Sequence, residues 1–129
     1  MSKILIVEDN SIIAKMLRTT LMLEGHDVSI APNGTAGLEK AQTDKPDLIL
    51  LDIMMPGMDG FEVCRRLREG EDTKDIPIVF LSNLYQSQHQ ELARQLGAID
   101  YLVKVHMAPP QLAEKVKEIL ARIAKDKEA

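Results

Sequence analysis

The feature that most constrains the fold of this chain is a fivefold alternation of short apolar runs with segments of helical periodicity. We expect strands over residues 3–8, 27–31, 47–51, 77–82 and 100–104, and helices over residues 11–25, 34–44, 61–70, 86–97 and 110–126. The runs at 47–51 and 77–82 are apolar on both faces, which is typical of a parallel sheet covered by helices on each side. The prediction is therefore an α/β fold: a doubly wound (βα)5 three-layer sandwich of flavodoxin-like type, with a five-stranded parallel sheet of order 2-1-3-4-5.

Local signals support the predicted helices. Ser11 is a possible N-cap for the first helix, and Pro110 suits the first turn of the last. Gly60, just before the third helix, permits a positive φ. Apolar residues recur at helical spacing in the first and last helices, at Ile12, Ile13, Met16, Leu17, Leu21 and Leu23 and at Leu112, Val116, Ile119, Leu120 and Ile123.

Composition narrows the class of protein. With 129 residues the chain has the length of one domain, which we place at residues 1–129. The net charge of −4 gives no electrostatic reason to bind nucleic acid or an anionic membrane. Cys64 is the one cysteine, which fits a reducing compartment, and we expect a cytoplasmic protein without a membrane span or secretory signal.

Polar side chains stand where four of the predicted strands end. The first strand ends in Glu8 and Asp9 and the third in Asp52, while Ser82 and Lys104 end the fourth and fifth. Ligands of such sheets bind beyond the carboxyl ends of the strands, so these groups should converge. Clustered carboxylates repel one another and favour a bound cation, and an all-oxygen site suits Mg²⁺. With an ammonium and a hydroxyl added, the set resembles a cradle for a phosphoryl group.

Each of these residues also has an ordinary structural interpretation when it is taken alone. Glu8 and Asp9 suit a strand exit beside a helix N-terminus, and Asp52 could cap a turn. Ser82 could be a turn hydroxyl, and Lys104 could be a solvated strand end. Their joint placement at one edge of the sheet is what favours a functional site.

Four segments of the chain resemble the receiver domain of two-component response regulators, the CheY-like family. They are "KILIVEDN", "DLILLDIMMPGMDGFEVCRRLRE", "IPIVFLSN" and "DYLVK", and the resemblance extends over essentially the whole length of the chain. The resemblance implies that Asp52 is the phosphoacceptor, and that Asp9 and Asp52 bind Mg²⁺ with the backbone carbonyl of Met54. It also implies that Glu8 assists through water and that Lys104 binds the phosphoryl oxygens.

The same resemblance implies a signalling role rather than a metabolic enzyme. A histidine kinase or histidine phosphotransfer protein would supply the phosphoryl group. Ser82 would hydrogen-bond the group after transfer, and Tyr101 would be the switch aromatic that turns inward. A downstream protein or a second copy would bind the face formed by the fourth helix, fifth strand and fifth helix. This domain itself would bind neither nucleic acid nor membrane.

Departures from the family pattern lie near Lys104. Family members usually carry proline after this lysine, in a cis peptide, whereas Val105 stands here. A cis bond before a non-proline residue costs about 2.5–4 kcal/mol, so either the bond is trans with a rearranged loop or strain is stored at the site. Asn83 replaces a small residue and could narrow access to Asp52. Met54 and Leu84 are apolar and cannot orient an attacking water, which predicts slow self-dephosphorylation.

Three other interpretations compete with this one. A phosphatase of the haloacid dehalogenase type would need an acid two residues after Asp52, where Met54 stands. A nucleotide-binding or flavodoxin-like module would need a phosphate-binding loop, but "VEDNS" has no glycine and is acidic. A receiver-like scaffold that is never phosphorylated stays open, as does the question whether the chain works alone or belongs to a longer protein.

Overall fold

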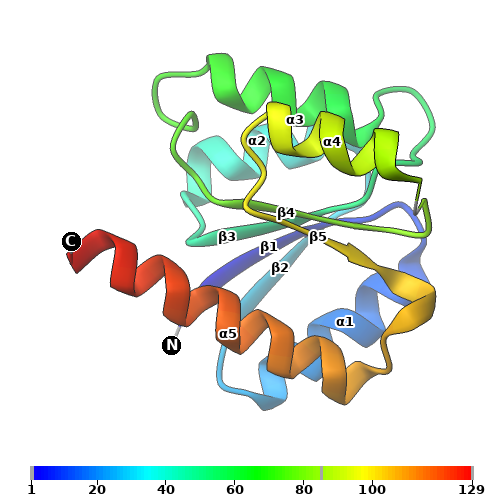
Figure 1. The fold of residues 1–129 in the computed structure, drawn as a ribbon, viewed down its shortest axis with the longest axis vertical. Coiled ribbons are helices and arrows are strands. Elements are labelled where there is room, and N and C mark those ends of the chain that lie inside the picture. The colour runs from blue at the N-terminus through cyan, green and yellow to red at the C-terminus, as the bar shows by residue number, and fades with distance from the viewer. Residues whose placement is uncertain (1, 85, 129) are drawn as a thin grey trace.

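Five parallel strands form one sheet with helices on both faces in the computed structural model, which describes residues 2–84 and 86–128 (Figure 1). The strand order β2-β1-β3-β4-β5 confirms the predicted topology. The strands are β1 (Lys3–Val7), β2 (Asp27–Ala31), β3 (Leu48–Leu51), β4 (Ile78–Ser82) and β5 (Asp100–Val103). The helices are α1 (Ser11–Leu23), α2 (Gly34–Asp44), α3 (Gly60–Glu69), α4 (Ser87–Gln95) and α5 (Pro109–Glu128), with a short 3-10 helix η1 (Lys104–His106) before α5.

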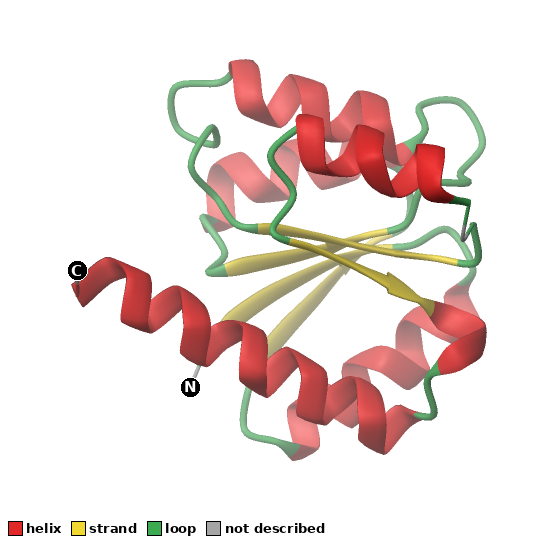
Figure 2. Cartoon of the chain, in the orientation of Figure 1, coloured by secondary structure: helices red, strands yellow, loops and turns green. Residues whose placement is uncertain are grey.

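Successive side chains along each strand point to opposite faces of the sheet, so the core consists of two layers. In β3, Ile49 and Leu51 face the layer beneath α2, α3 and α4, while Leu48 and Leu50 face the layer beneath α1 and α5. Figure 2 shows the sheet between these two groups of helices. Because β1, β3 and β4 are buried on both faces, their sequences are continuous apolar runs, as the sandwich prediction requires.

The N-cap of helix α1 lies one residue earlier than predicted. Asn10, not Ser11, is the N-cap, because its side-chain oxygen accepts hydrogen bonds from the backbone N–H groups of Ile12 and Ile13, at 3.0 and 3.1 Å. The buried stripe of α1 is also narrower than its apolar spacing indicated. Leu17 and Leu21 pack in the core, whereas Ile12 and Leu23 lie on the opposite side and are about four-fifths exposed, at 80% and 83%.

The predicted apolar face of α5 is confirmed, since Leu112, Val116 and Ile119 are buried against the sheet and α1. The helix begins at Pro109, so both prolines of the "APP" sequence lie in its first turn. Within the described part of the chain, no helix has the length and apolar character needed to cross a membrane.

The segment between β5 and α5 differs most from the family pattern. The last residue of β5 is Val103, and Lys104 opens η1 instead of ending the strand. No peptide bond between the described residues is cis, so the Lys104–Val105 bond is trans. Of the two alternatives that the sequence left open, the structure has the trans bond with a rearranged turn.

The side chain of Arg68 in α3 connects three segments at the edge of the sheet where the strands begin. Its guanidinium donates hydrogen bonds to the carbonyls of Lys74 and Ile76 before β4, at 2.9 and 2.8 Å. It also donates to the carbonyls of Leu96 and Gly97 after α4, at 3.3 and 3.0 Å. The planar fork of arginine suits such a set of acceptors, since it presents five N–H donors in fixed directions.

Candidate functional site

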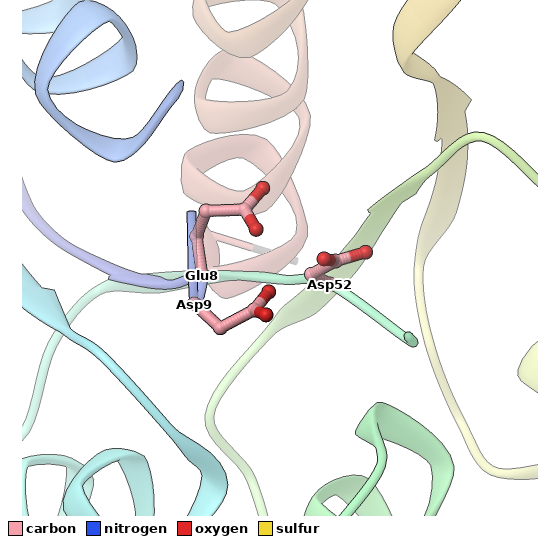
Figure 3. A group of neighbouring side chains, drawn as sticks. All are labelled: Glu8, Asp9 and Asp52. Atoms are coloured by element: carbon pink, nitrogen blue, oxygen red, sulfur yellow. The ribbon is translucent and has the colours of Figure 1, made fainter. Parts of the chain in front are cut away.

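Three carboxylates meet where β1 and β3 end. Val7 pairs with Leu51 in the parallel ladder, so the residues that follow, Glu8 and Asp52, leave the sheet side by side. Glu8, Asp9 and Asp52 each offer a carboxylate oxygen, and these oxygens lie within 4.8 Å of one another (Figure 3). Glu8 and Asp52 are buried, at 3% and 7% exposure, while Asp9 is exposed.

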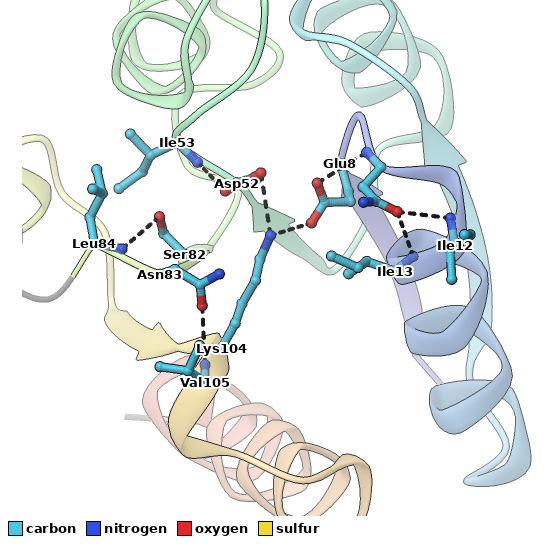
Figure 4. Close-up of polar contacts among 11 residues, drawn as sticks. Glu8, Ile12, Ile13, Asp52, Ile53, Ser82, Asn83, Leu84, Lys104 and Val105 are labelled. Atoms are coloured by element: carbon cyan, nitrogen blue, oxygen red, sulfur yellow. Dashed lines mark hydrogen bonds and ion pairs between the residues drawn. The ribbon is translucent and has the colours of Figure 1, made fainter.

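Lys104 reaches into this cluster from the far side of β4. Its ammonium donates to Glu8 Oε1 and lies 3.3 Å from Asp52 Oδ2 (Figure 4). The lysine side chain is 15% exposed, so the pairs are screened less than pairs on an open surface. A cation thus already stands between two of the three carboxylates, which is the position that neutralises most of their repulsion.

Backbone donors fix the two buried carboxylates. The N–H of Ile53 donates to Asp52 Oδ1 at 2.8 Å, and the N–H of Asn10 donates to Glu8 Oε2 at 3.3 Å. Burial raises the pKa of the Glu8 carboxyl above its ordinary value, and the Asp52 carboxylate raises it further, although the hydrogen bond from Lys104 acts in the opposite direction. A nearby cation therefore favours the ionised form of Glu8.

The loop after Asp52 is held against the start of α3 by a glycine. Gly60 would permit a positive φ, but the structure does not use that freedom, because Gly25, Gly57 and Gly97 are the glycines with positive φ in the described chain. Gly60 is needed for close approach instead. A Cβ there would lie 2.1 Å from the carbonyl oxygen of Asp52 and 2.8 Å from Cα of Ile53.

Ser82 and Tyr101 both contact the loop that follows β4. Ser82 is buried, and its Oγ accepts a hydrogen bond from the Leu84 N–H at 3.3 Å. The Tyr101 hydroxyl donates to the Leu84 carbonyl at 2.6 Å, and its ring centroid lies 6.2 Å from that of Phe80. Burial raises the pKa of the Tyr101 phenol. The two residues that the resemblance assigns to switching are thus connected through one residue, Leu84.

The donor set fits a hard divalent cation. Three carboxylates from two adjacent strand ends supply oxygen ligands only, two of them buried and held by backbone N–H groups, and Mg²⁺ prefers such oxygens. The ammonium of Lys104 occupies part of the same negative region. Glu8, Asp9 and Asp52 are the residues that would bind the cation, and the Met54 carbonyl is the fourth ligand that the resemblance predicts.

A depression of about 660 Å³ adjoins the carboxylates on the side of α3 and α4. Asp9, Met54 and Leu84 contribute to its lining, which places both apolar residues beside the site as the sequence predicted. His89 lines it too, and its ring stacks on Phe61 with centroids 6.3 Å apart. No spacing in the sequence connects His89 with the strand ends.

Comparisons with known proteins agree with this geometry. The family model of the response regulator receiver domain matches residues 4–117. The chain is 41% identical over 120 residues to the alkaline phosphatase synthesis transcriptional regulatory protein PhoP of Bacillus subtilis. The matched region covers 93% of this chain and 49% of that protein. The chain is likewise 41% identical over 122 residues to the DNA-binding dual master transcriptional regulator RpaA of Synechocystis, covering 95% of this chain and 50% of that protein. The chain thus spans about half the length of these curated relatives.

Solved structures show the same similarity. The chemotaxis protein CheY4 of Vibrio cholerae superimposes with a TM-score of 0.85 at 32% identity, covering 92% of this chain and 98% of that one. A CheY-like receiver domain protein of Methanospirillum hungatei superimposes with a TM-score of 0.88 at 28% identity, covering 98% of both chains.

Proposed function

Because the chain belongs to the response regulator receiver domain family, we propose that it accepts a phosphoryl group on Asp52 and acts as a phosphorylation-dependent switch in a two-component or phosphorelay system. The observation that supports this most directly is the buried Asp52 carboxylate between Glu8, Asp9 and Lys104 at the carboxyl edge of the sheet. Members of this family are signalling phosphoacceptors, not metabolic enzymes.

In the proposed reaction a carboxylate oxygen of Asp52 attacks the phosphorus of a phosphohistidine. The new O–P bond gives an aspartyl phosphate, the P–N bond breaks, and the imidazole leaves with its electron pair and takes up a proton. Lys104 binds the oxygens of the transferred group, since its ammonium already lies 3.3 Å from Asp52. Mg²⁺, held by Asp9, Asp52 and the Met54 carbonyl with Glu8 assisting through water, would neutralise negative charge on the phosphoryl oxygens.

The proposed switch starts at Ser82. Its hydroxyl hydrogen-bonds the phosphoryl group, which draws in the loop that Leu84 connects to Tyr101. The affected surface is the α4–β5–α5 face, where Tyr101 lies beside α4 and where Asp100 pairs with Arg122 of α5 at 3.5 Å. The phosphoryl group can shift this face only by the difference in its interaction with the two conformations.

The proposed partners follow from the family. A histidine kinase or a histidine phosphotransfer protein supplies the phosphoryl group, and a downstream protein or a second copy binds the α4–β5–α5 face. We assign residues 1–129 to a single receiver domain with a cytoplasmic location, and with no binding of nucleic acid or membrane by this domain itself. The relatives include longer transcription regulators. For this chain we propose that the output is the binding of a protein partner.

The test is site mapping of the modification. The protein is incubated with acetyl phosphate and Mg²⁺, and the phosphorylated peptide is identified by mass spectrometry at neutral pH. We expect modification on Asp52, and none when a chelator removes Mg²⁺. A protein that stays unmodified under Mg²⁺, or that carries the group on another residue, would refute the proposed function.

Once formed, the aspartyl phosphate should be hydrolysed slowly, over minutes to hours rather than seconds. The apolar side chains of Met54 and Leu84 stand beside the site and offer no group to orient an attacking water. The decay is followed on phosphate-affinity gels after the donor is removed. Met54→Asn should accelerate hydrolysis several-fold, while Met22→Asn, at a methionine of similar exposure at the far end of α1, should leave it unchanged. Decay of the aspartyl phosphate within seconds in the protein without substitutions would contradict the prediction.

A further inference from the structure

The missing proline after Lys104 leaves a backbone N–H that this chain uses. Val105 donates that N–H to the side-chain oxygen of Asn83 at 3.1 Å (Figure 4). We propose that Asn83 is a positioning residue: it anchors the turn Lys104–His106 and so holds the Lys104 ammonium between Glu8 and Asp52. The placement of Lys104 by Asn83 is a property of the folded protein and needs no phosphorylation. Only the effect of this placement on the phosphorylation rate rests on the proposed function.

The bond continues the connection between β4 and β5 beyond the sheet. The parallel ladder pairs Ser82 with Val103 and then stops, as the chain turns into η1. Asn83 is the next residue after Ser82, and its side chain reaches the second residue after Val103. A side-chain amide thus ties the two strands together one step further than the backbone does. Proline at 105 could not form this bond, because it has no N–H.

The turn has little burial to hold it in place. Of its three residues, Lys104 is half-buried, while Val105 and His106 are exposed, Val105 to 69%. Beside it lies a cavity of about 150 Å³, lined by residues of α1, of the end of β4 with Asn83, of the turn itself and of the start of α5. A second hydrogen bond, from the Met107 N–H to the Lys104 carbonyl at 3.2 Å, is internal to the turn. The bond to Asn83 is therefore the polar contact that connects the turn to β4.

The anchor also stands inside the loop assigned to switching. Asn83 lies between Ser82, whose Oγ accepts from Leu84, and Leu84, whose carbonyl accepts from Tyr101. A movement of Ser82 would reach β5 through Leu84 and would reach the Lys104 turn through Asn83. Residues 82–84 thus connect the phosphoacceptor site to β5 and to the turn that follows β5.

The experiment compares Asn83→Leu, which keeps the side-chain size but removes the acceptor, with Asn83→Asp, which keeps an oxygen. Hydrogen exchange at the Val105 amide is measured by NMR on the full chain without phosphodonor. Acylation of Lys104 by an amine-reactive ester is measured by mass spectrometry relative to the exposed Lys15. We expect Asn83→Leu to accelerate both about threefold to tenfold, as the loss of one hydrogen bond predicts, and Asn83→Asp to resemble the unmodified protein.

Val105→Ala is the matched control, since it keeps the N–H and should leave both rates unchanged. Unchanged exchange at Val105 in Asn83→Leu would overturn the anchor, and faster exchange without faster Lys104 acylation would overturn the positioning role. If both rates rise, phosphorylation by acetyl phosphate should also slow in Asn83→Leu and recover in Asn83→Asp. The exchange and acylation results need no phosphoryl transfer, so they stand even if Asp52 is never modified and the proposed function fails.

Discussion

Replacing Asp52 with asparagine should abolish modification by acetyl phosphate and, in the absence of Mg²⁺, raise the free energy of unfolding. The first effect follows because the amide has no nucleophilic carboxylate oxygen. The second follows from the charges at the site, where three carboxylates face the single ammonium of Lys104. Two like charges about 4 Å apart repel by roughly 4 kcal/mol at an effective dielectric constant near 20.

The net increase in the free energy of unfolding should be smaller than the energy of one such charge repulsion. Asp52→Asn removes the repulsion from Glu8 and Asp9, but it also removes the attraction to Lys104, which keeps its bond to Glu8. The amide oxygen can still accept from the Ile53 N–H. We therefore expect an increase of about 1–2 kcal/mol, on the scale at which neighbouring charges shift stability.

Urea unfolding with and without Mg²⁺ measures both parts of this prediction. Mg²⁺ should stabilise the unmodified protein by mass action and should stabilise Asp52→Asn much less. Asp59→Asn is the matched control, because Asp59 is the exposed N-cap of α3 and asparagine caps a helix equally well. It should keep both phosphorylation and Mg²⁺ stabilisation. Persistent labelling of Asp52→Asn, or a loss of stability without Mg²⁺, would contradict the charge argument.

Much of the fold was predictable from the sequence because burial on both faces of the sheet leaves a strong local pattern. The runs that became β3 and β4 are apolar on both sides, and the order of strands and helices follows from the alternation. The convergence of Glu8, Asp9 and Asp52 was predictable for the same reason, since strand ends of a parallel sheet meet at one edge.

What the sequence did not predict depends on distances between segments. Asn83 was expected to narrow access to Asp52, and its bond to Val105 requires knowing where the turn after β5 lies. Arg68 contacts carbonyls up to 29 residues away in sequence, which no local periodicity encodes. Ile12 and Leu23 share the apolar helical spacing of α1 but are exposed, because such spacing alone does not distinguish a buried stripe from apolar residues beside it.

Gly60 is another example, and Gly60→Ala should be strongly destabilising, because a Cβ there has the closest contact among the glycines of the described chain. The added methyl group would lie 2.1 Å from the Asp52 carbonyl oxygen, 2.9 Å from the Asp52 carbonyl carbon and 2.8 Å from Cα of Ile53. These are backbone atoms, so no rotamer change relieves the overlap. The Gly60 N–H also donates to the Ile53 carbonyl at 2.9 Å, which keeps the two segments together.

We expect Gly60→Ala to lower the free energy of unfolding by about 3 kcal/mol, the upper part of the range for overpacked sites. Because the displaced atoms belong to Asp52 itself, the folded fraction should also be phosphorylated at least tenfold more slowly. Gly57→Ala is the matched control in the same loop. Gly57 has φ of +79° and open space around its Cβ position, so alanine there should cost only about 1 kcal/mol of backbone strain and leave the carboxylate in place.

Urea denaturation gives the stability of both variants, and acetyl phosphate labelling, corrected for the folded fraction, gives the rate. If the loss is caused by steric overlap, Gly60→Ala should have a lower free energy of unfolding and a slower phosphorylation rate than Gly57→Ala. Equal losses would mean that the helix start moves away from Asp52 at little cost. In that case the position of the phosphoacceptor would depend on β3 and the Ile53 N–H alone, and not on the contact between its backbone and α3.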